Sequence, residues 1–340
     1  MNKLLISYND IISLKNLHAA WIEFESGKWL KADVAEFNLK LPQNVFSLHE
    51  DLKYKRYIHG SYEAFKINDP KPRDIHKATV RDRLLHHAIY RILSPIFDRR
   101  FIYDSYSCRF GKGTHRALER FKHFSRKVSK NNRRTCWTLK CDVRKFFASI
   151  DHEILVDIVR RHITDADIIC LLQRVVESFS SIGKGKGLPL GNLTSQMLVN
   201  VYMNEFDQFV KHGLKQKYYV RYADDFVIMN EDVGVLMEVL PKVHDFLEDR
   251  LKLSLHPKKV SIRTVASGVD FLGWVHFPKH RVLRSATKYR MFRRLESRIL
   301  GGNQEKIEAS RDSYLGMLKW GNTYGLSKKV RKLTKTSSPT

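Results

Sequence analysis

The chain lacks the features of a membrane-spanning or a secreted, disulfide-bonded protein. It has no run of about 18 consecutive apolar residues, and the apolar stretch near its N-terminus is too short for a signal peptide. Its 4 cysteines form no Cys-x-x-Cys pair and have no nearby histidine at a spacing typical of zinc sites. We therefore expect reduced thiols in a cytoplasmic protein without a membrane.

Acidic residues are scarce relative to basic ones. The 340 residues include 61 Lys and Arg against 36 Asp and Glu, which gives a net charge of +25. Such a charge favours a polyanionic partner, although ribosomal and chromatin proteins share this property. The length predicts a sizeable core and two or three compact units.

Two adjacent carboxylates interrupt an apolar stretch at residues 218–229. Asp224 and Asp225 lie between two runs of β-branched and aromatic residues, where the most easily formed hairpin turns have Asn-Gly or Asp-Gly. Because neighbouring carboxylates repel each other, their place between apolar strands is expected where a site needs them. The alternative, a surface turn with solvated acids, conflicts with the apolar flanks. A divalent cation is the expected partner of these two carboxylates.

A third carboxylate, Asp142, ends the strand-like run 136–143. An amphipathic helix follows, with one apolar face formed by Ile154, Leu155, Ile158, Val159 and Ile163. Three carboxylates at the ends of neighbouring strands can hold two Mg²⁺ ions, for which Mn²⁺ is a possible substitute. A two-metal site activates a 3′-hydroxyl and stabilises departing pyrophosphate, so this pattern indicates nucleotidyl transfer.

With these residues the chain resembles a reverse transcriptase. Tyr222–Asp225 is similar to motif C of the family's palm, and Asp142 to motif A. Residues 187–196 resemble the motif B loop, and residues 253–259 resemble motif D. The family's primer grip corresponds to Phe271, Leu272, Gly273 and Trp274. Segments 71–73, 81–83 and 105–115 resemble its fingers, so the resemblance covers roughly residues 50 to 325.

The resemblance implies an α+β right-hand polymerase, whose palm is a small antiparallel sheet backed by helices. Residues 1–135 would form an N-terminal helical segment and the fingers, 136–280 the palm, and 281–340 a helical thumb with a basic C-terminal tail. We expect a palm helix to begin near Ser195 and thumb helices over 281–298 and 307–326. The tail from Lys328 is predicted to be mobile. Nicking and RNA removal would come from other proteins.

The resemblance also implies the metal ligands. Asp142 and Asp224 would bind the ions directly, and Asp225 would support them. The Val143 carbonyl would complete one coordination shell. In motif D, Lys259 would donate a proton to the departing pyrophosphate, with its neighbour Lys258 or a simple phosphate contact as the alternatives.

Further residues would bind the incoming nucleotide. Lys66 and Arg73 flank a turn-like segment, residues 68–72, and would place two cations on the triphosphate. The ring of Phe147 would collide with a 2′-hydroxyl of the incoming nucleotide. The alternative is an aromatic side chain that simply fills the core, and Phe146 fits that description at least as well.

The motif B loop has two notable residues at this nucleotide site. Leu190 cannot make the hydrogen bonds of the family's usual glutamine, so discrimination against mismatched nucleotides should be weaker. The alternative is that Leu190 only packs beneath the nucleotide and has no effect on fidelity. Gly191 allows a close approach of the backbone.

The same loop favours one subfamily. Intron and retroviral enzymes usually end it in Ser-Pro, whereas Ser195 and Gln196, with Leu190, resemble the reverse transcriptases of diversity-generating retroelements. Residues 111–115 and 313–326 favour the same subfamily. Its members copy a template-repeat RNA into cDNA and misincorporate opposite template adenines.

The partners implied are a structured template RNA, its cDNA, the RNA–DNA duplex, dNTPs and a small basic accessory protein that forms a ring. One alternative is a reverse transcriptase from antiviral defence or an intron-derived lineage. Another is an RNA-binding scaffold that has lost catalysis. The intact Asp142, Asp224 and Asp225 argue against the scaffold, because a dead site has no electrostatic reason to keep three acids that repel each other.

Overall fold

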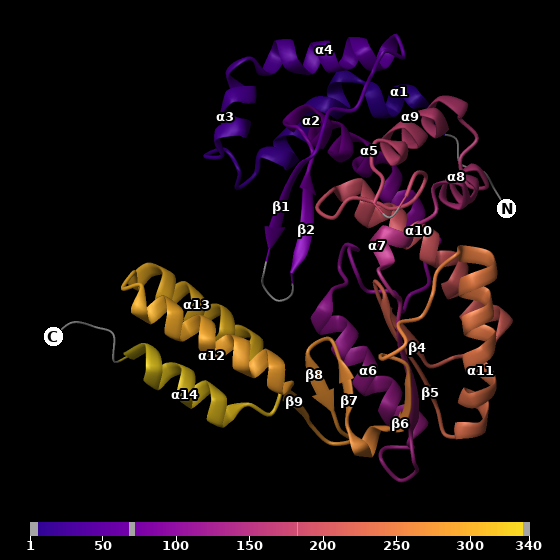
Figure 1. Ribbon diagram of the computed structural model, residues 1–340, viewed down its shortest axis with the longest axis vertical. Helices are drawn as coiled ribbons and strands as arrows, with labels where there is room; N and C mark the ends of the chain where they lie inside the picture. The colour runs from indigo at the N-terminus through magenta and orange to yellow at the C-terminus, as the bar shows by residue number, and fades with distance from the viewer. Residues whose placement is uncertain (1–5, 68–71, 182, 336–340) are drawn as a thin grey trace. The chain divides into compact units, whose positions relative to one another are not determined.

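The chain forms two compact units, each assembled from three separate segments. The computed structural model describes residues 6–67, 72–181 and 183–335 (Figure 1). The first unit comprises Met1–Arg109, Val143–Lys215 and Lys242–His256, and the second comprises Phe110–Asp142, Gln216–Pro241 and Pro257–Thr340.

Helices dominate the first unit. They are α1 (Tyr8–Ile12), α2 (Leu14–Glu25), α3 (Ala32–Leu39), α4 (Leu41–Lys53), α5 (Val80–Asp98), α7 (Phe146–Ser149), α8 (His152–Arg160), α9 (Ala166–Glu177), α10 (Leu193–Gln208) and the π-helical turns η1 (Phe209–Gly213) and η2 (Phe246–Arg250). Several begin at a side-chain cap. The side chains of Thr79, Asp151 and Asp165 accept hydrogen bonds from the first backbone N–H groups of α5, α8 and α9. Helix α5 packs against both α2 and α10.

Two predicted helices are confirmed in this unit. Helix α10 begins at Leu193, close to the predicted start at Ser195, and buries Leu198, Val199, Tyr202 and Phe206. Helix α8 buries Leu155, Val156, Ile158 and Val159, whereas the predicted Ile163 lies beyond its end. The i, i+3, i+4 pattern was informative because one face of each helix meets the core.

A two-stranded hairpin also belongs to the first unit. Strands β1 (Glu63–Ile67) and β2 (Arg73–Lys77) are antiparallel, with Ile67 opposite Arg73. The predicted turn falls almost entirely on residues 68–71, which lie outside the described residues. The backbone N–H of His76 donates to the Leu190 carbonyl at 3.2 Å and thereby ties β2 to the loop before α10.

The second unit contains a four-stranded antiparallel sheet in the order β4-β5-β3-β6. Its strands are β4 (Tyr219–Tyr222), β5 (Asp225–Asn230), β3 (Trp137–Asp142) and β6 (Ser261–Thr264). Helix α6 (Thr114–Val128) packs against β4 and β5 (Figure 1). Its apolar face includes Leu118, Phe121 and Phe124. The short 3-10 turn η3 (Val265–Ser267) follows β6, and α11 (Val233–Asp245) contains the boundary between the units.

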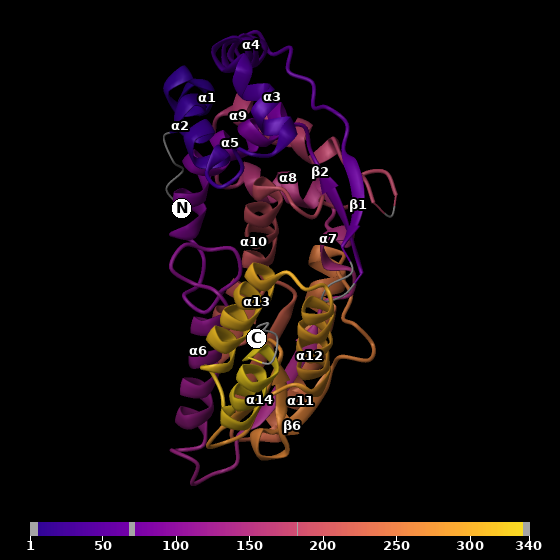
Figure 2. The ribbon, with the colours of Figure 1, turned by 90° about the vertical axis from the view of Figure 1, so that its left-hand side faces the viewer.

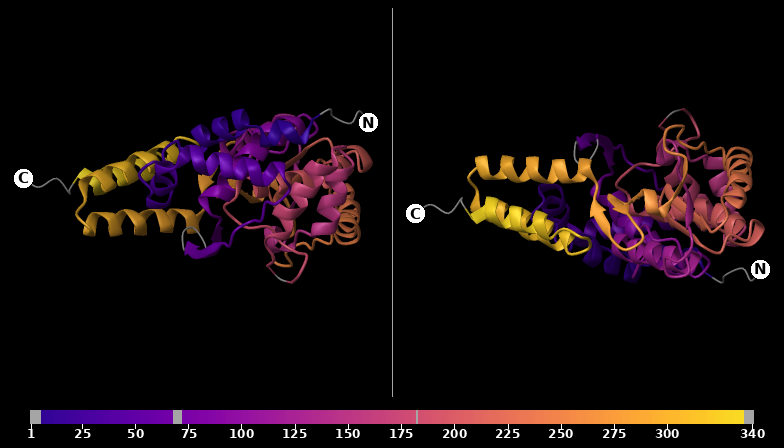
Figure 3. Two further views of the ribbon diagram at one scale, coloured as in Figure 1. Left: turned by 90° about the horizontal axis from the view of Figure 1, so that it is seen from above. Right: turned by 90° about the horizontal axis from the view of Figure 1, so that it is seen from below.

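A three-stranded sheet and three helices complete the second unit. The sheet has the order β7 (Val269–Phe271), β8 (Trp274–His276) and β9 (Arg281–Leu283). Helices α12 (Ser285–Leu300), α13 (Gln304–Leu318) and α14 (Tyr324–Lys335) follow and pack on one another (Figures 2 and 3).

Three expectations for this C-terminal region were wrong. The helix predicted over 307–326 is interrupted, because α13 ends at Leu318 and α14 begins only at Tyr324. Residues 281–283 are a strand instead of the start of a helix, because Arg281 pairs with His276 across β9 and β8. The tail predicted to be mobile is helical up to Lys335, because Val330 and Thr334 lie one turn apart and are buried. Residues 336–340 lie outside the described residues. Across the described chain, no helix is both long and apolar enough to cross a membrane.

Candidate active site

Two of the predicted carboxylates face each other on adjacent strands. Asp142 is the last residue of β3, Asp225 is the first of β5, and the two are register partners. Asp224 lies in the two-residue turn that joins β4 to β5, next to Asp225. All three acids therefore gather at one end of the four-stranded sheet, as the sequence motif predicted.

The turn that carries Asp224 is strained and held in place. Ala223 has φ +54°, a left-handed conformation that costs a non-glycine residue about 1–2 kcal/mol. The buried Arg221 guanidinium donates from Nη1 to the Ala223 carbonyl at 3.0 Å. The Thr114 hydroxyl, at the start of α6, donates to the Tyr222 hydroxyl at 3.2 Å. Strain of this kind is typical of functional turns that their surroundings keep in shape.

The environment of Asp225 favours a bound cation. Burial raises the pKa of Asp225 to about 7, with Lys140 opposing this shift and the charges of Asp142 and Asp224 adding to it. Lys140 Nζ lies 3.6 Å from Asp225 Oδ1. That oxygen is buried and has no hydrogen-bond partner among the described residues. A buried carboxylate oxygen that accepts no hydrogen bond is unusual, and a metal ion would satisfy it.

Asp142 has a lysine partner from motif D. Lys259 Nζ donates to Asp142 Oδ1 at 2.7 Å, and the lysine side chain is partly exposed. Lys259 is the motif D lysine that was proposed from the sequence as the proton donor. The ammonium group balances one acid of the repelling cluster, and its exposed part can reach a phosphate.

The carboxylates can bind a divalent cation only if the cation replaces their contacts with Lys140 and Lys259. Asp142 and Asp225 offer the oxygen ligands that Mg²⁺ prefers. Within the described residues, however, no three His, Cys, Asp or Glu side chains are arranged to hold a metal. Lys140 and Lys259 contact the acids instead. Val143, whose carbonyl was predicted as a further ligand, is a buried residue of the first unit.

The predicted nucleotide-binding loop lies in the first unit. Gly191 has φ +116°, and an added β-carbon would lie 3.2 Å from Ile75 Cγ2, so this position favours glycine for two reasons. Leu190, which is half-buried, precedes it and accepts the hydrogen bond from β2. The loop is therefore hydrogen-bonded to strand β2 and packs closely against it.

Three further predicted residues belong to the same unit. Lys66 and Arg73 are exposed on β1 and β2, at the described ends of the hairpin. Phe146 is buried whereas Phe147 is half-buried, which separates the core aromatic from the available one. The Phe147 carbonyl accepts a hydrogen bond from Leu188 N at 2.8 Å, and Phe147 is thus tied to the loop that contains Leu190.

The predicted primer grip is a tight hairpin of the second unit. Phe271 and Trp274 pair across β7 and β8, and Leu272 (φ +52°) and Gly273 (φ +83°) form the turn. Positive φ at both central residues is the geometry of the turns that suit the twist of a hairpin. An added β-carbon at Gly321, after α13, would lie 2.0 Å from the Trp274 ring.

Lys140 and Arg221 contribute to the acidic site, and the motif comparison missed both. Lys140 lies two residues before Asp142 in a strand, so alternation alone places both side chains on one face. Arg221 is a charged residue inside an apolar run, which is itself a signal that a buried site needs a cation.

Comparison with known proteins adds independent information. The sequence model of the family described as reverse transcriptase (RNA-dependent DNA polymerase) matches residues 66–276. The chain is 27% identical over 247 residues to Protein YkfC of Escherichia coli (strain K12), with 62% of this chain and 63% of that protein covered. It is 24% identical over 338 residues to the group II intron-encoded protein LtrA of Lactococcus lactis subsp. cremoris, with 79% and 54% covered. The chain thus spans less than two thirds of either relative.

A solved structure supports the fold. The telomerase of Candida albicans, in complex with a TWJ fragment of telomeric RNA, matches with a TM-score of 0.51 and 11% identity over 75% of this chain and 52% of that one. At this identity the match concerns the fold alone. The predicted α+β polymerase fold is confirmed.

Proposed function

Because the chain belongs to the reverse transcriptase (RNA-dependent DNA polymerase) family, we propose that it copies RNA into cDNA by two-metal nucleotidyl transfer. The observation that supports this most directly is the pairing of Asp142 with Asp225 beside the strained turn of Asp224. A buried carboxylate oxygen that accepts no hydrogen bond destabilises the fold, and a catalytic use of the acidic site with bound cations explains why the chain keeps it.

The acids would hold Mg²⁺, with Mn²⁺ as a possible substitute. Asp142 and Asp224 are the proposed direct ligands, while Asp225 and the Val143 carbonyl support them. When bound, the ions activate the primer 3′-hydroxyl and neutralise the phosphates. Lys259 is the proposed proton donor to pyrophosphate, since its ammonium already lies 2.7 Å from Asp142 Oδ1.

The nucleotide contacts would come from the first unit. Lys66 and Arg73 bring exposed cations from one hairpin to the triphosphate of a dNTP. The ring of Phe147 excludes a 2′-hydroxyl, and Gly191 lets the backbone approach the nucleotide. The functional division that we propose is fingers in 1–135, palm in 136–280 and thumb in 281–340, with the hairpin tip at Leu272 gripping the primer.

Within the family, we propose a polymerase of the diversity-generating type. The half-buried aliphatic side chain of Leu190 next to Gly191 supports this, because it cannot restrain the base pair by hydrogen bonds. The product would be adenine-mutagenised cDNA of a template-repeat RNA. Its partners in the cytoplasm would be that RNA, the RNA–DNA duplex and a small basic ring-forming accessory protein. The similarity to LtrA favours a second candidate, an intron-derived reverse transcriptase of ordinary fidelity.

Primer extension tests both candidates. The protein is supplied with Mg²⁺, four dNTPs and a heteropolymeric RNA template, and the cDNA is sequenced. Asp224→Ala should abolish the product. Asp312→Ala, which removes an exposed carboxylate of the same unit, should leave it intact.

The error spectrum then separates the candidates. Errors concentrated opposite template adenines support the diversity-generating type, and accurate cDNA supports the intron-derived one. Equal inactivity of wild type and Asp224→Ala, even with the accessory protein and cognate RNA added, would indicate an RNA-binding scaffold.

A further inference from the structure

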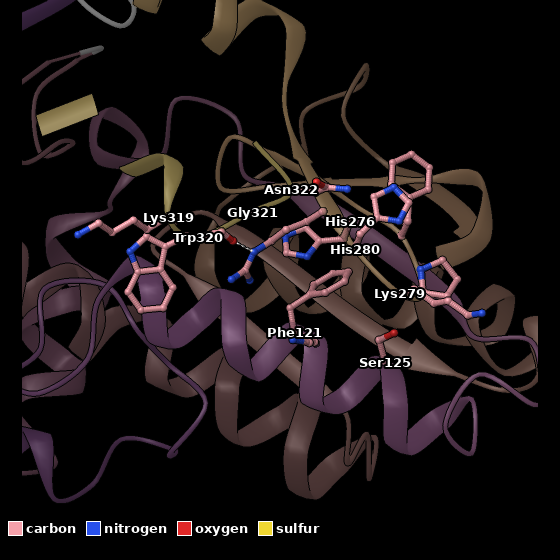
Figure 4. A pocket seen from close by; sticks show the side chains of 13 residues that line it. Phe121, Ser125, His276, Lys279, His280, Lys319, Trp320, Gly321 and Asn322 are labelled. Atoms are coloured by element: carbon pink, nitrogen blue, oxygen red, sulfur yellow. Dashed lines mark hydrogen bonds between the residues drawn. The ribbon is translucent and has the colours of Figure 1, made fainter. Parts of the chain in front are cut away.

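A basic and aromatic pocket lies within the second unit, and none of the three proposed catalytic acids lines it. Its volume is about 370 Å³, within the ~300–1,000 Å³ range of small-ligand sites. Helix α6 forms the floor, the β8–β9 turn forms one wall, and the connection between α13 and α14 forms another (Figure 4). In Figure 4, Phe121 points from α6 toward His276.

Hydrogen bonds between the walls hold the pocket in shape. Asn322 N donates to the Arg281 carbonyl at 2.8 Å, and Arg281 Nε donates to the Trp320 carbonyl. Arg281 Nη2 forms an ion pair with Glu119 Oε1 at 2.7 Å. The pocket is therefore preformed, and a ligand would lose little affinity to ordering of the protein.

Two buried nitrogen atoms at this pocket have no hydrogen-bond partner among the described residues. They are Nε2 of His276, whose side chain belongs to a residue only 3% exposed, and Nη1 of Arg281. Burial, with the Arg281 charge, lowers the pKa of His276 to about 3, so its imidazole is neutral at pH 7. Buried polar atoms are almost always paired, and a ligand with polar edges would pair these two.

The charges around the pocket select an anion. Lys122, Lys279 and Lys319 are exposed at its lining, and none of the described lining residues is acidic. Arg281 adds a fourth cation, balanced by its ion pair. Lys279 and Lys319 lie at opposite sides of the pocket in Figure 4, so a phosphate group at either side would meet an ammonium group that can donate hydrogen bonds.

The aromatic rings select a flat ligand in addition. The Phe277 and His280 rings are stacked, with centroids 5.0 Å apart and 17° between planes. The Phe121 ring lies 4.3 Å from that of His276. Aromatic side chains together with cations are the combination that binds unstacked nucleotides.

We propose that this pocket is a nucleotide subsite that takes one nucleoside monophosphate unit. The phosphate would lie at the rim beside Lys279 or Lys319, and the polar edge of the base would meet His276 and Arg281. Such a unit comes either from single-stranded RNA or from a free nucleotide. A duplex does not qualify, since its bases are stacked and paired. The inference goes beyond the proposed polymerase reaction and needs no catalysis.

Photo-crosslinking tests the proposal on the full chain. Single-stranded RNA that contains 4-thiouridine is irradiated with the protein, without Mg²⁺ or dNTPs, and crosslinked peptides are identified by mass spectrometry. We expect crosslinks within 276–281 and 319–322. The double variant Lys279→Glu/Lys319→Glu should lower their yield by at least about tenfold. The matched control Lys127→Glu/Lys130→Glu alters two exposed lysines outside the lining and should lower it less than about twofold.

The conservative variant His276→Phe tests the buried nitrogen, because it keeps a ring of similar shape. We expect a lower crosslink yield from this variant, with an unchanged circular dichroism spectrum. Equal losses in the lysine variant and its control would overturn the proposal in favour of a general basic surface.

Competitors identify the ligand. Unlabelled AMP should suppress the crosslinks at concentrations where inorganic phosphate and duplex RNA do not. If AMP instead protects the pocket peptides from labelling while RNA gives no crosslink there, the free nucleotide is the source. Suppression by phosphate as strong as by AMP would refute a base-binding site, and stronger suppression by polyglutamate would indicate an acidic protein partner instead. The crosslinking test does not measure polymerisation, so its result is independent of the primer-extension assay.

Discussion

Replacing Gly321 with alanine should destabilise the second unit, because there is no room for a β-carbon. The added atom would lie 2.0 Å from Trp274 Cζ3 and 2.8 Å from Cε3 and Cη2, far inside van der Waals contact. Trp274 cannot easily yield, since it is 3% exposed and its backbone pairs with Phe271 on one side and Leu283 on the other. The φ of Gly321 lies outside the left-handed region, so the expected effect is steric and not a matter of backbone strain.

The magnitude follows from overpacking of a well-packed site, which costs about 1–3 kcal/mol. Trp274→Phe removes the ring atoms that the β-carbon would meet, and by itself should cost roughly 1–3 kcal/mol through lost burial. If the clash is the cause, the double variant should be less unstable than the sum of the two single variants. We expect a coupling free energy of about 1–3 kcal/mol.

Urea unfolding followed by circular dichroism at 222 nm measures these free energies. Gly316→Ala is the matched control: it lies inside α13, and no described atom is within 4 Å of an added β-carbon. This control should raise stability by about 0.5–1 kcal/mol, as is usual for a helical glycine. A Gly321→Ala variant as stable as wild type, or strictly additive losses in the double variant, would refute the steric argument.

Three further predictions concern charge, fidelity and pH. Lys259→Ala should lower the rate of primer extension by about 10²-fold or more, whereas Lys258→Ala should lower it much less; equal effects would contradict the assigned role. Leu190→Gln should lower the error frequency opposite template adenines in sequenced cDNA, and an unchanged spectrum would mean that Leu190 only packs. Burial and the nearby His59 lower the pKa of His86 from 6.5 to about 3, so between these values the unfolded chain binds a proton that the folded chain does not. The contribution of His86 to the free energy of unfolding is therefore fully present above pH 6.5 and falls with acidification, by up to about 2 kcal/mol from pH 7 to pH 5. His86→Gln should flatten the dependence of the melting temperature on pH. An unchanged slope would contradict this assignment.

The sequence by itself determined the local elements and the identity of the acids. The apolar period of α8 and α10 specified which faces are buried, and the run around Asp224 and Asp225 specified two strands with a turn between them. These features depend on residues a few positions apart, whose relations are set by helix and strand geometry. The matching motif order then sufficed to indicate the family.

Only the tertiary structure decided which partners surround those residues. The register that places Asp142 opposite Asp225, and the contact of Lys259 with Asp142, join segments far apart in the chain. The segment from Lys328 to Lys335 is basic and polar in sequence, yet it is helical because Val330 is buried. The pocket on α6 likewise arises from three distant segments. Composition and local period carry no information about which distant side chains meet, because that depends on how the elements pack and on which polar atoms the packing leaves unpaired.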